Sequence, residues 1–132
     1  RVLLQPMAIQ QLLENISIDA QTYFVLITHN YKYDLAVLKL LVQTNCNYIG
    51  ILGPKTKLNR MLDDLNSEGI QLTEEKLTTI YGPVGLDLGA ETAEEIALSI
   101  VAEIKAVMSG KQGVSLKYKT EKIHSSPHTS LV

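Results

Sequence analysis

The sequence YIGILGPKTKLNR, residues 48–60, decides the fold because it predicts a strand, a glycine turn and the start of a helix in direct succession. Residues 48–52 form an apolar run without strict alternation, which is typical of a parallel strand covered on both faces. Gly53 can adopt backbone conformations closed to other residues, and Pro54 fixes the backbone angle that a first helical position needs. We therefore expect a buried strand, a turn at Gly53 and a helix that starts at Pro54.

Three cationic residues, Lys55, Lys57 and Arg60, lie at the start of that predicted helix. Cations oppose the helix dipole at this end, so local helix stability does not explain them. A phosphate would meet free backbone N–H groups and two or three cationic side chains there. The alternative is a solvated charged face, the usual role of a run of charges. The sequence favours the anion site.

The composition indicates a single globular domain with a core of its own. The chain has 132 residues, of which 45% are hydrophobic, and a formal net charge of -2. No apolar run approaches the length of a membrane span, and no signal peptide is visible, so we expect no membrane association. The single cysteine, Cys46, cannot form an internal disulfide, and a reducing compartment, hence the cytoplasm, is expected.

The charge is distributed unevenly along the chain. Residues 111–132 carry four lysines and one glutamate, which makes this segment +3 and leaves the rest at -5. An acidic body argues against nucleic acid as a partner. The chain begins with Arg1 instead of methionine, so we expect it to be a piece of a longer protein.

Strand and helix patterns alternate about three times around the opening segment, which predicts an α/β fold with a parallel sheet flanked by helices. The expected domain covers residues 1–110, and residues 111–132 are expected to form a mobile tail because they are polar and lack periodicity. The expected strands are residues 2–4, 23–27, 48–52 and 77–81. The expected helices are residues 5–15, 34–44, a helix from Pro54 that stops at Gly69, one turn over 73–76, and residues 92–108.

The last of these helices starts with a capping box formed by Thr92 and Glu95. Helical spacing then predicts its buried face. The expected core residues of this helix are Ala93, Ala97, Ile100, Ile104 and Val107 or Met108.

Three chemically distinctive loops follow the three central strands. They are residues 28–30, 53–57 and 82–89. Ligands of parallel α/β sheets bind outside the carboxyl ends of the strands, so we expect these loops to surround one crevice. The candidate cofactor-binding residues are Thr28, His29, Gly53, Lys55, Lys57, Gly82, Gly85, Asp87 and Gly89.

Several of these residues allow a second interpretation. His29 either caps the end of a strand by hydrogen bonding or serves as a phosphate donor or proton carrier. The glycine-rich loop either approaches a ligand or another subunit closely or is a plain connection. Asp34 is interpreted as a carboxylate favoured by the dipole of its helix.

Catalytic and metal-binding patterns are missing from the sequence. There is no nucleophile elbow, no serine or cysteine paired with His29, and no carboxylate pair placed for acid–base chemistry. No second histidine or cysteine lies at metal-ligand spacing. We therefore predict no catalytic residues and no metal site, and we interpret Cys46 as a small buried residue.

Four linked motifs between about residues 23 and 108 resemble the C-terminal Rossmann-like domain of the XdhC/CoxI family, the xanthine dehydrogenase accessory proteins. The motifs are Thr28-His29 with Asp34 and Leu38; YIGILG at 48–53 with Lys57; PVGLDLGA at 83–90 with EEIA at 94–97; and Ser99-Ile100 with Ala102-Glu103-Ile104.

This resemblance implies a cytoplasmic maturation factor, a carrier more than an enzyme. It would bind the molybdenum cofactor (molybdopterin) and assist its insertion into a molybdenum hydroxylase such as xanthine dehydrogenase, and a cysteine desulfurase is a possible further partner. On this reading the phosphate of the cofactor lies at Gly53, Lys55 and Lys57, and the glycine-rich loop flanks the same crevice.

The chain departs from the family pattern in three respects. Pro54 replaces the usual serine, and Ala93 replaces the usual proline. The glycine-rich dinucleotide fingerprint is absent, so the implied fold is a Rossmann-like sheet that lacks its first β-α-β portion. In such a sheet the missing first strand lies beside residues 23–27, so that strand becomes an uncovered edge. We expect homo-oligomerisation along it, or a rearrangement that buries it.

The sequence leaves two other function classes open. An NAD(P)-dependent oxidoreductase uses the same architecture, although the glycine fingerprint and a proton-relay pair are lacking. A dimerisation domain without any ligand is the third possibility. Binding of NAD(P)H or of molybdopterin separates the three.

Overall fold

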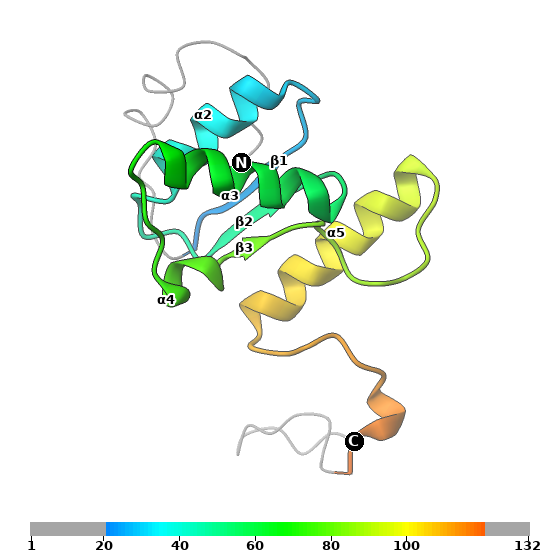
Figure 1. The fold of residues 1–132 in the computed structure, drawn as a ribbon. Coiled ribbons are helices and arrows are strands. Elements are labelled where there is room, and N and C mark those ends of the chain that lie inside the picture. Colours follow the sequence, from blue (N-terminus) through cyan, green and yellow to red (C-terminus); the bar gives the residue numbers. More distant parts are fainter. Residues whose placement is uncertain (1–20, 121–132) are drawn as a thin grey trace.

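The computed structural model describes residues 21–120, which form a three-stranded parallel sheet with helices on both faces (Figure 1). The strands lie in the order β1 (Tyr23–Leu26), β2 (Tyr48–Ile51) and β3 (Ile80–Tyr81). The helices are α2 (Tyr31–Leu41), α3 (Lys55–Ser67), α4 (Glu74–Leu77) and α5 (Ala93–Met108), and a 3-10 turn, η1 (Leu116–Tyr118), follows them. The predicted α/β fold with a parallel, Rossmann-like sheet is confirmed.

The central strand, β2, is buried at all four positions, as its continuous apolar run predicts. It pairs with β1 through the register Tyr23↔Tyr48 and with β3 through Ile49↔Ile80. Its alternating residues point to the two faces of the sheet, so β2 separates two layers of different composition.

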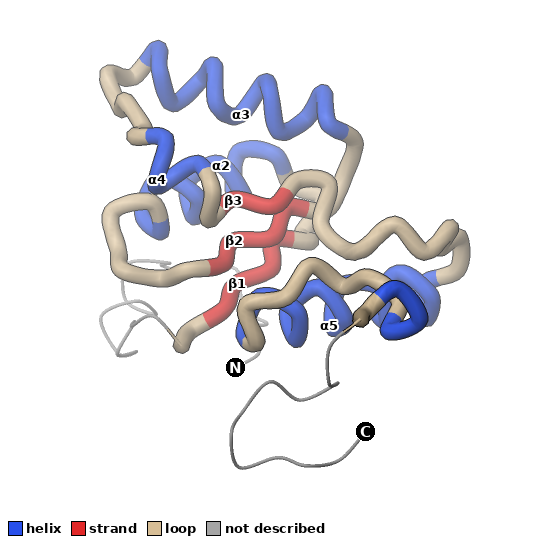
Figure 2. The backbone as a smooth tube through the Cα atoms, turned by 90° about the horizontal axis from the view of Figure 1, so that it is seen from below, coloured by secondary structure: helices blue, strands red, loops and turns tan. Residues whose placement is uncertain are grey.

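The first face of the sheet carries the apolar core, which α2 and α3 cover (Figure 2). Ile49 and Ile51 of β2 pack there with residues of both helices, including Leu38, Met61 and Leu65, which are completely buried. Met61 and Leu65 lie four positions apart and so share one face of α3. Gly69, two residues after the end of α3, terminates the helix with a φ of 84°. Gly69 N–H donates to Asn66 O, and Ile70 N–H donates to Leu65 O.

The second face of the sheet is aromatic and polar, and α5 lies against it. The Tyr48 ring stacks on Tyr81 at 4.6 Å between centroids and tilts against Tyr23 at 5.8 Å. Gly50 has no side chain, and the buried Val84 occupies the space beside it, since a Cβ on Gly50 would lie 2.5 Å from Val84 Cγ2. The loop after β3 thereby packs directly on the sheet.

Several boundaries differ from the sequence expectations because capping residues set them. α2 begins at Tyr31, three residues early, because the Asn30 side chain accepts a hydrogen bond from Tyr33 N–H at 3.1 Å. Pro54 is the N-cap of α3 and not its first helical residue. β3 is shorter than predicted because α4, capped by Thr73, continues to Leu77.

The predicted core face of α5 is only partly correct, because Ile100, Ile104 and Val107 are half-buried and the other predicted positions are exposed. Ala93 and Ala97 are exposed, and Met108 is 61% exposed, whereas the buried residue of this helix is Ser99. The capping box of Thr92 and Glu95 is confirmed. Its exposed side carries Glu94, Glu95 and Lys105, whereas the side that faces the protein is mainly apolar, and Ser99 and Glu103 make the polar contacts described below.

Several predicted elements lie at or beyond the ends of the described residues 21–120. Residues 2–4 and 5–15 lie outside it, as do residues 121–132 of the expected tail, whereas residues 116–118 form η1. Among the described residues β1 pairs with β2 alone, and self-association along its other edge stays a prediction. Within residues 21–120, no helix is both long enough and apolar enough to cross a membrane.

Candidate functional site: a pocket between the glycine-rich loop and α5

A pocket of about 560 Å³ lies at the carboxyl end of β2, between the glycine-rich loop and α5. It is lined by Leu52 and Gly53 of the turn after β2, by residues 83–90 of the loop, and by Ile96 and Ser99 of α5. The volume falls in the range of small-molecule sites in proteins. Its position at the carboxyl edge of the sheet is the place where α/β folds bind ligands.

The first part of the loop is attached to the protein through consecutive backbone N–H groups. Val84 N–H donates to Ile51 O at 3.0 Å, Gly85 N–H donates to the Glu103 carboxylate at 3.0 Å, and Leu86 N–H donates to Ser99 O at 3.1 Å. These donors are used by the protein itself, so this wall of the pocket is held in one conformation by both β2 and α5.

Gly85 allows the loop to approach α5 closely. Its φ is 109°, a region that disfavours side chains, and an added Cβ would lie 2.4 Å from Ser99 Oγ. Ser99 is itself buried, and its hydroxyl donates to Ile96 O at 2.7 Å. The glycine predicted as a binding residue therefore has a direct packing role between loop and helix.

Glu103 connects α5, the loop and the sheet. Its Oε1 accepts hydrogen bonds from Tyr48 Oη at 2.8 Å and from Gly85 N–H at 3.0 Å. Burial of the ring raises the pKa of Tyr48 above its usual value, and the hydrogen bond to Glu103 and the carboxylate charge add to this effect. Burial and the Glu103 charge likewise raise the pKa of Tyr81.

We expect the variant Tyr48→Phe to lose about 1–2 kcal/mol of unfolding free energy, because a hydrogen bond to a charged group is removed. In the parent chain, the pKa of Tyr48 is raised by folding. The protonated phenol therefore stabilises the fold fully below about pH 10, the usual tyrosine pKa, and this contribution is lost as the pH rises through the native pKa. Urea unfolding between pH 7 and 11 should show a smaller alkaline loss for the variant than for the parent chain. The exposed Tyr118→Phe is the control, and an equal loss in both variants would contradict this role.

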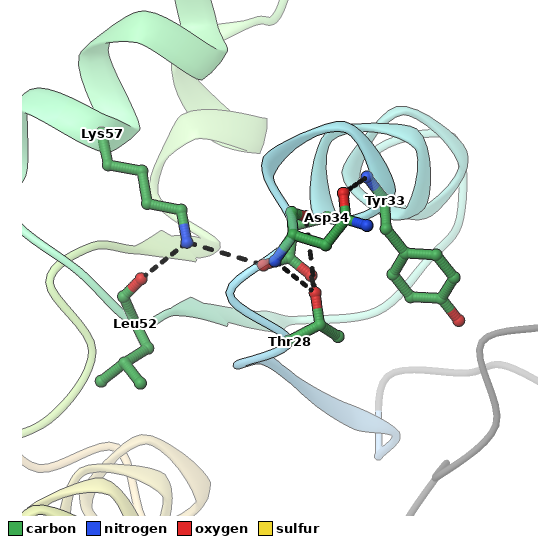
Figure 3. Close-up of polar contacts among 6 residues, drawn as sticks. Thr28, Tyr33, Asp34, Leu52 and Lys57 are labelled. Carbon is green, nitrogen blue, oxygen red and sulfur yellow. Dashed lines mark hydrogen bonds and ion pairs between the residues drawn. The ribbon is translucent and has the colours of Figure 1, made fainter.

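A second polar cluster lies beside the pocket, at the ends of β1 and β2 (Figure 3). Asp34 is completely buried, and its Oδ1 accepts a hydrogen bond from Thr28 Oγ1 at 2.7 Å. Lys57 Nζ lies 3.5 Å from the other carboxylate oxygen, Oδ2, and donates to Leu52 O at 3.0 Å. Lys57 therefore neutralises a buried carboxylate and joins the two strand ends.

The remaining cations at the start of α3 have different positions. Lys55 is exposed, and its Nζ lies 3.4 Å from Gly82 O. Arg60 lies over the Tyr31 ring, with Cζ 4.1 Å from the centroid. Burial and the hydrogen bond to Asp64 raise the pKa of Tyr31 to about 12.

His29 lies in the loop between β1 and α2 and has a left-handed backbone, with φ 63°. Such a conformation costs a non-glycine residue about 1–3 kcal/mol and is more frequent at functional sites. The side chain is exposed, and among residues 21–120 it has no hydrogen-bond partner, so the capping interpretation has no support there.

The structure brings some of the predicted site residues together and leaves others outside the pocket. Gly53, Gly85, Asp87 and Gly89 line it. The predicted residues that do not line it are Thr28, His29, Lys55, Lys57 and Gly82. Lys57 nevertheless contacts the pocket wall, because a Cβ on Gly53 would lie 2.8 Å from its Cδ and because it bonds Leu52 O.

Three residues of the site have roles that the sequence does not predict. From the local sequence, Asp34 is expected only at the start of a helix. Glu103 and Ser99 are expected only as members of a family motif. No spacing rule pairs residues that lie 23 or 55 positions apart, such as Asp34 with Lys57 or Tyr48 with Glu103. The signal that the sequence offers is the presence of Ser99 and Glu103 within the otherwise apolar residues 96–104.

Comparison with known proteins relates the whole domain to one family. Residues 3–104 match the XdhC Rossmann domain. A probable xanthine dehydrogenase subunit from Bacillus subtilis (strain 168) is 35% identical over 95 residues, which cover 72% of this chain and 26% of that protein. The molybdenum cofactor insertion chaperone PaoD from Escherichia coli (strain K12) is 32% identical over 90 residues, which cover 68% of this chain and 28% of that protein.

A solved structure shows the same relationship. The crystal structure of a xanthine dehydrogenase from Bacillus halodurans superimposes with a TM-score of 0.64 and 29% sequence identity, over 77% of this chain and 29% of that one. The chain therefore spans less than a third of the length of each of these three relatives.

Proposed function

We propose, from the premise that this chain belongs to the XdhC Rossmann-domain family, that it holds the molybdenum cofactor for a molybdenum hydroxylase of the xanthine dehydrogenase type. The observation that supports this most is the pocket at the carboxyl end of β2, which the family motif at residues 83–90 lines. The relative named as a molybdenum cofactor insertion chaperone supports an accessory role over an enzymatic one.

The residues present fit the two ends of such a cofactor. Molybdopterin combines a hydrogen-bonding ring system, of which the pyrimidine ring is flat, with a phosphate. The pocket offers glycine backbone and apolar side chains to the ring. The start of α3, next to Gly53, has no side-chain cap and no acidic residue in its first turn, so its N–H groups and the exposed Lys55 suit the phosphate. When bound, the cofactor supplies the redox chemistry of the client enzyme.

We assign the predicted residues different tasks within this site. Gly53, Gly85, Asp87 and Gly89 surround the ring system, whereas Lys55 contacts the phosphate from the rim, next to Gly82. Lys57 acts through Asp34 and Thr28 by holding the turn after β2 in place. His29 is a further contact at the outer edge of the site.

Assembly and location complete the proposal. The client is a molybdenum hydroxylase, and a cysteine desulfurase is a candidate supplier of the sulfur that the mature cofactor carries. Two copies of the chain associate along the edge of β1 that is unpaired among residues 21–120. The single cysteine is free and buried, which suits the cytoplasm.

A binding measurement tests this function. The chain is incubated anaerobically with molybdenum cofactor released from a purified molybdenum enzyme, separated by gel filtration, and assayed for pterin by fluorescence after oxidation. We expect the cofactor to co-elute with the chain and NADPH not to do so. Lys55→Ala should weaken retention by about threefold to tenfold, because one charge-assisted contact to phosphate is lost.

The alternatives give different results in the same assay. Retention of NADPH but not of the cofactor would indicate an oxidoreductase. Retention of neither would indicate a dimerisation domain. Exposed Lys117→Ala, outside the pocket, is the control for a general effect of positive charge.

A further inference from the structure

The cationic residues of the site lie outside the pocket lining, and Lys57, which contacts the wall at Leu52 and Gly53, has its Nζ 3.0 Å from Leu52 O and 3.5 Å from Asp34 Oδ2. Asp87 is the one ionisable side chain among the pocket-lining residues of the described chain, and Lys55, Lys57 and Arg60 do not line it. A negatively charged group inside this pocket would therefore meet a carboxylate and no counter-charge. The lining favours the uncharged part of a ligand.

The backbone of the loop supports the same conclusion. An anion cradle needs several neighbouring N–H groups directed at the ligand. The N–H groups of Val84, Gly85 and Leu86 instead donate to Ile51 O, Glu103 Oε1 and Ser99 O. This first part of the loop thus has its N–H donors directed into the protein and not at a ligand.

Asp87 follows directly after these three anchored residues. It is exposed, and within residues 21–120 its carboxylate has no hydrogen bond or ion pair. The anchors before it limit the freedom of its backbone, and Asp87 is one of the residues that line the pocket. A carboxylate accepts two hydrogen bonds at once from a pair of adjacent donors.

We propose that Asp87 recognises the donor edge of a 2-amino-4-oxopyrimidine ring, such as that of a pterin, and that the pocket selects this ring and not the phosphate. The ring presents a ring N–H and an exocyclic amino group side by side, which match the two oxygens of one carboxylate. This assignment rests on the proposed function and specifies which group of the ligand each part of the site binds.

A pair of small probes tests the assignment without any loaded enzyme. Pterin carries the 2-amino group, and lumazine carries an oxygen in its place. Isothermal titration calorimetry of the chain at pH 7 should show at least about tenfold tighter binding of pterin than of lumazine, since a lumazine oxygen would face the carboxylate. Asp87→Asn should reduce this preference to less than about twofold.

Two controls separate the carboxylate from general effects. Glu91→Gln removes an exposed carboxylate just after the loop, outside the pocket lining, and should keep the pterin preference. Lys55→Ala should also keep it while lowering cofactor retention. Circular dichroism of each variant verifies the fold.

The results that would refute ring recognition by Asp87 differ from those that would refute the proposed carrier function. Equal binding of pterin and lumazine, no pterin binding, or an unchanged preference in Asp87→Asn each refutes the role of Asp87. If the cofactor still co-elutes in that case, the carrier function stands and only the recognition of the ring is wrong. If pterin is preferred but the cofactor is not retained, the carrier function is wrong.

Discussion

Replacing Lys57 with methionine is expected to lower the free energy of unfolding by about 3 kcal/mol, because it leaves a buried carboxylate without a counter-charge. Asp34 is completely buried, and its Oδ2 has no hydrogen-bond donor among the described residues; Lys57 Nζ, at 3.5 Å, is the cation beside it. Methionine keeps much of the packing of the lysine stem, so the loss reports mainly on charge. Urea unfolding at pH 7 measures it.

A double-mutant cycle shows whether this loss comes from the pair. Asp34→Asn retains an acceptor for Thr28 Oγ1 but removes the charge. We expect the double variant, with both substitutions, to recover about half or more of the loss seen in Lys57→Met alone. A loss below about 1 kcal/mol in the single variant, or no recovery in the double variant, contradicts the role assigned to the pair.

The second large effect is expected for Gly85→Ala, which should destabilise the fold by about 3 kcal/mol and abolish pterin binding. An alanine there would adopt a φ of 109° and place its Cβ 2.4 Å from Ser99 Oγ, so the loop must move away from α5. That movement breaks the bonds of Gly85 and Leu86 to α5 and alters the pocket wall. Thermal unfolding and calorimetry with pterin measure the two effects.

Two further variants show whether the effects of Gly85→Ala come from contact with α5 or from backbone strain. Gly89→Ala also replaces a loop glycine with positive φ, 66°, but an added Cβ would have no atom within 4 Å, so it should cost only about 1 kcal/mol and preserve binding. Adding Ser99→Gly to Gly85→Ala removes the clashing side chain and should restore part of the pterin binding. Equal effects of the two alanine variants would show that backbone strain alone, and not contact with α5, controls the loop.

The sequence predicts those parts of the fold that depend on local patterns. The buried strand β2, the turn at Gly53, the glycine that ends α3 and the capping box of α5 each depend on a few consecutive residues. The family resemblance, based on four motifs, is confirmed by the match over residues 3–104.

The parts that the sequence does not predict depend on long-range polar pairs. The sequence favours Lys57 as an anion ligand because no acidic residue lies in the first turn of its own helix, but its counter-charge comes from α2. Apolar spacing places Ile100, Ile104 and Val107 on the inner side of α5, where they are half-buried, but it does not predict that Ser99 and Glu103 beside them bond the loop and Tyr48. Such long-range contacts become evident only from the positions of the helices and strands in the folded chain.

The polar attachment of α5 has a consequence for how a cargo could leave the pocket. Leu98 and Val101 of this helix are 62% and 63% exposed, and its inward apolar residues are only half-buried, so the hydrophobic effect holds α5 less strongly than it holds α2 and α3, which fully bury apolar side chains. Segments with few buried apolar contacts separate from a protein at a smaller free-energy cost than that of global unfolding. We therefore expect transient detachment of the α5 wall while the layer formed by α2, α3 and the strands stays intact, which would ease the release of a bound molecule.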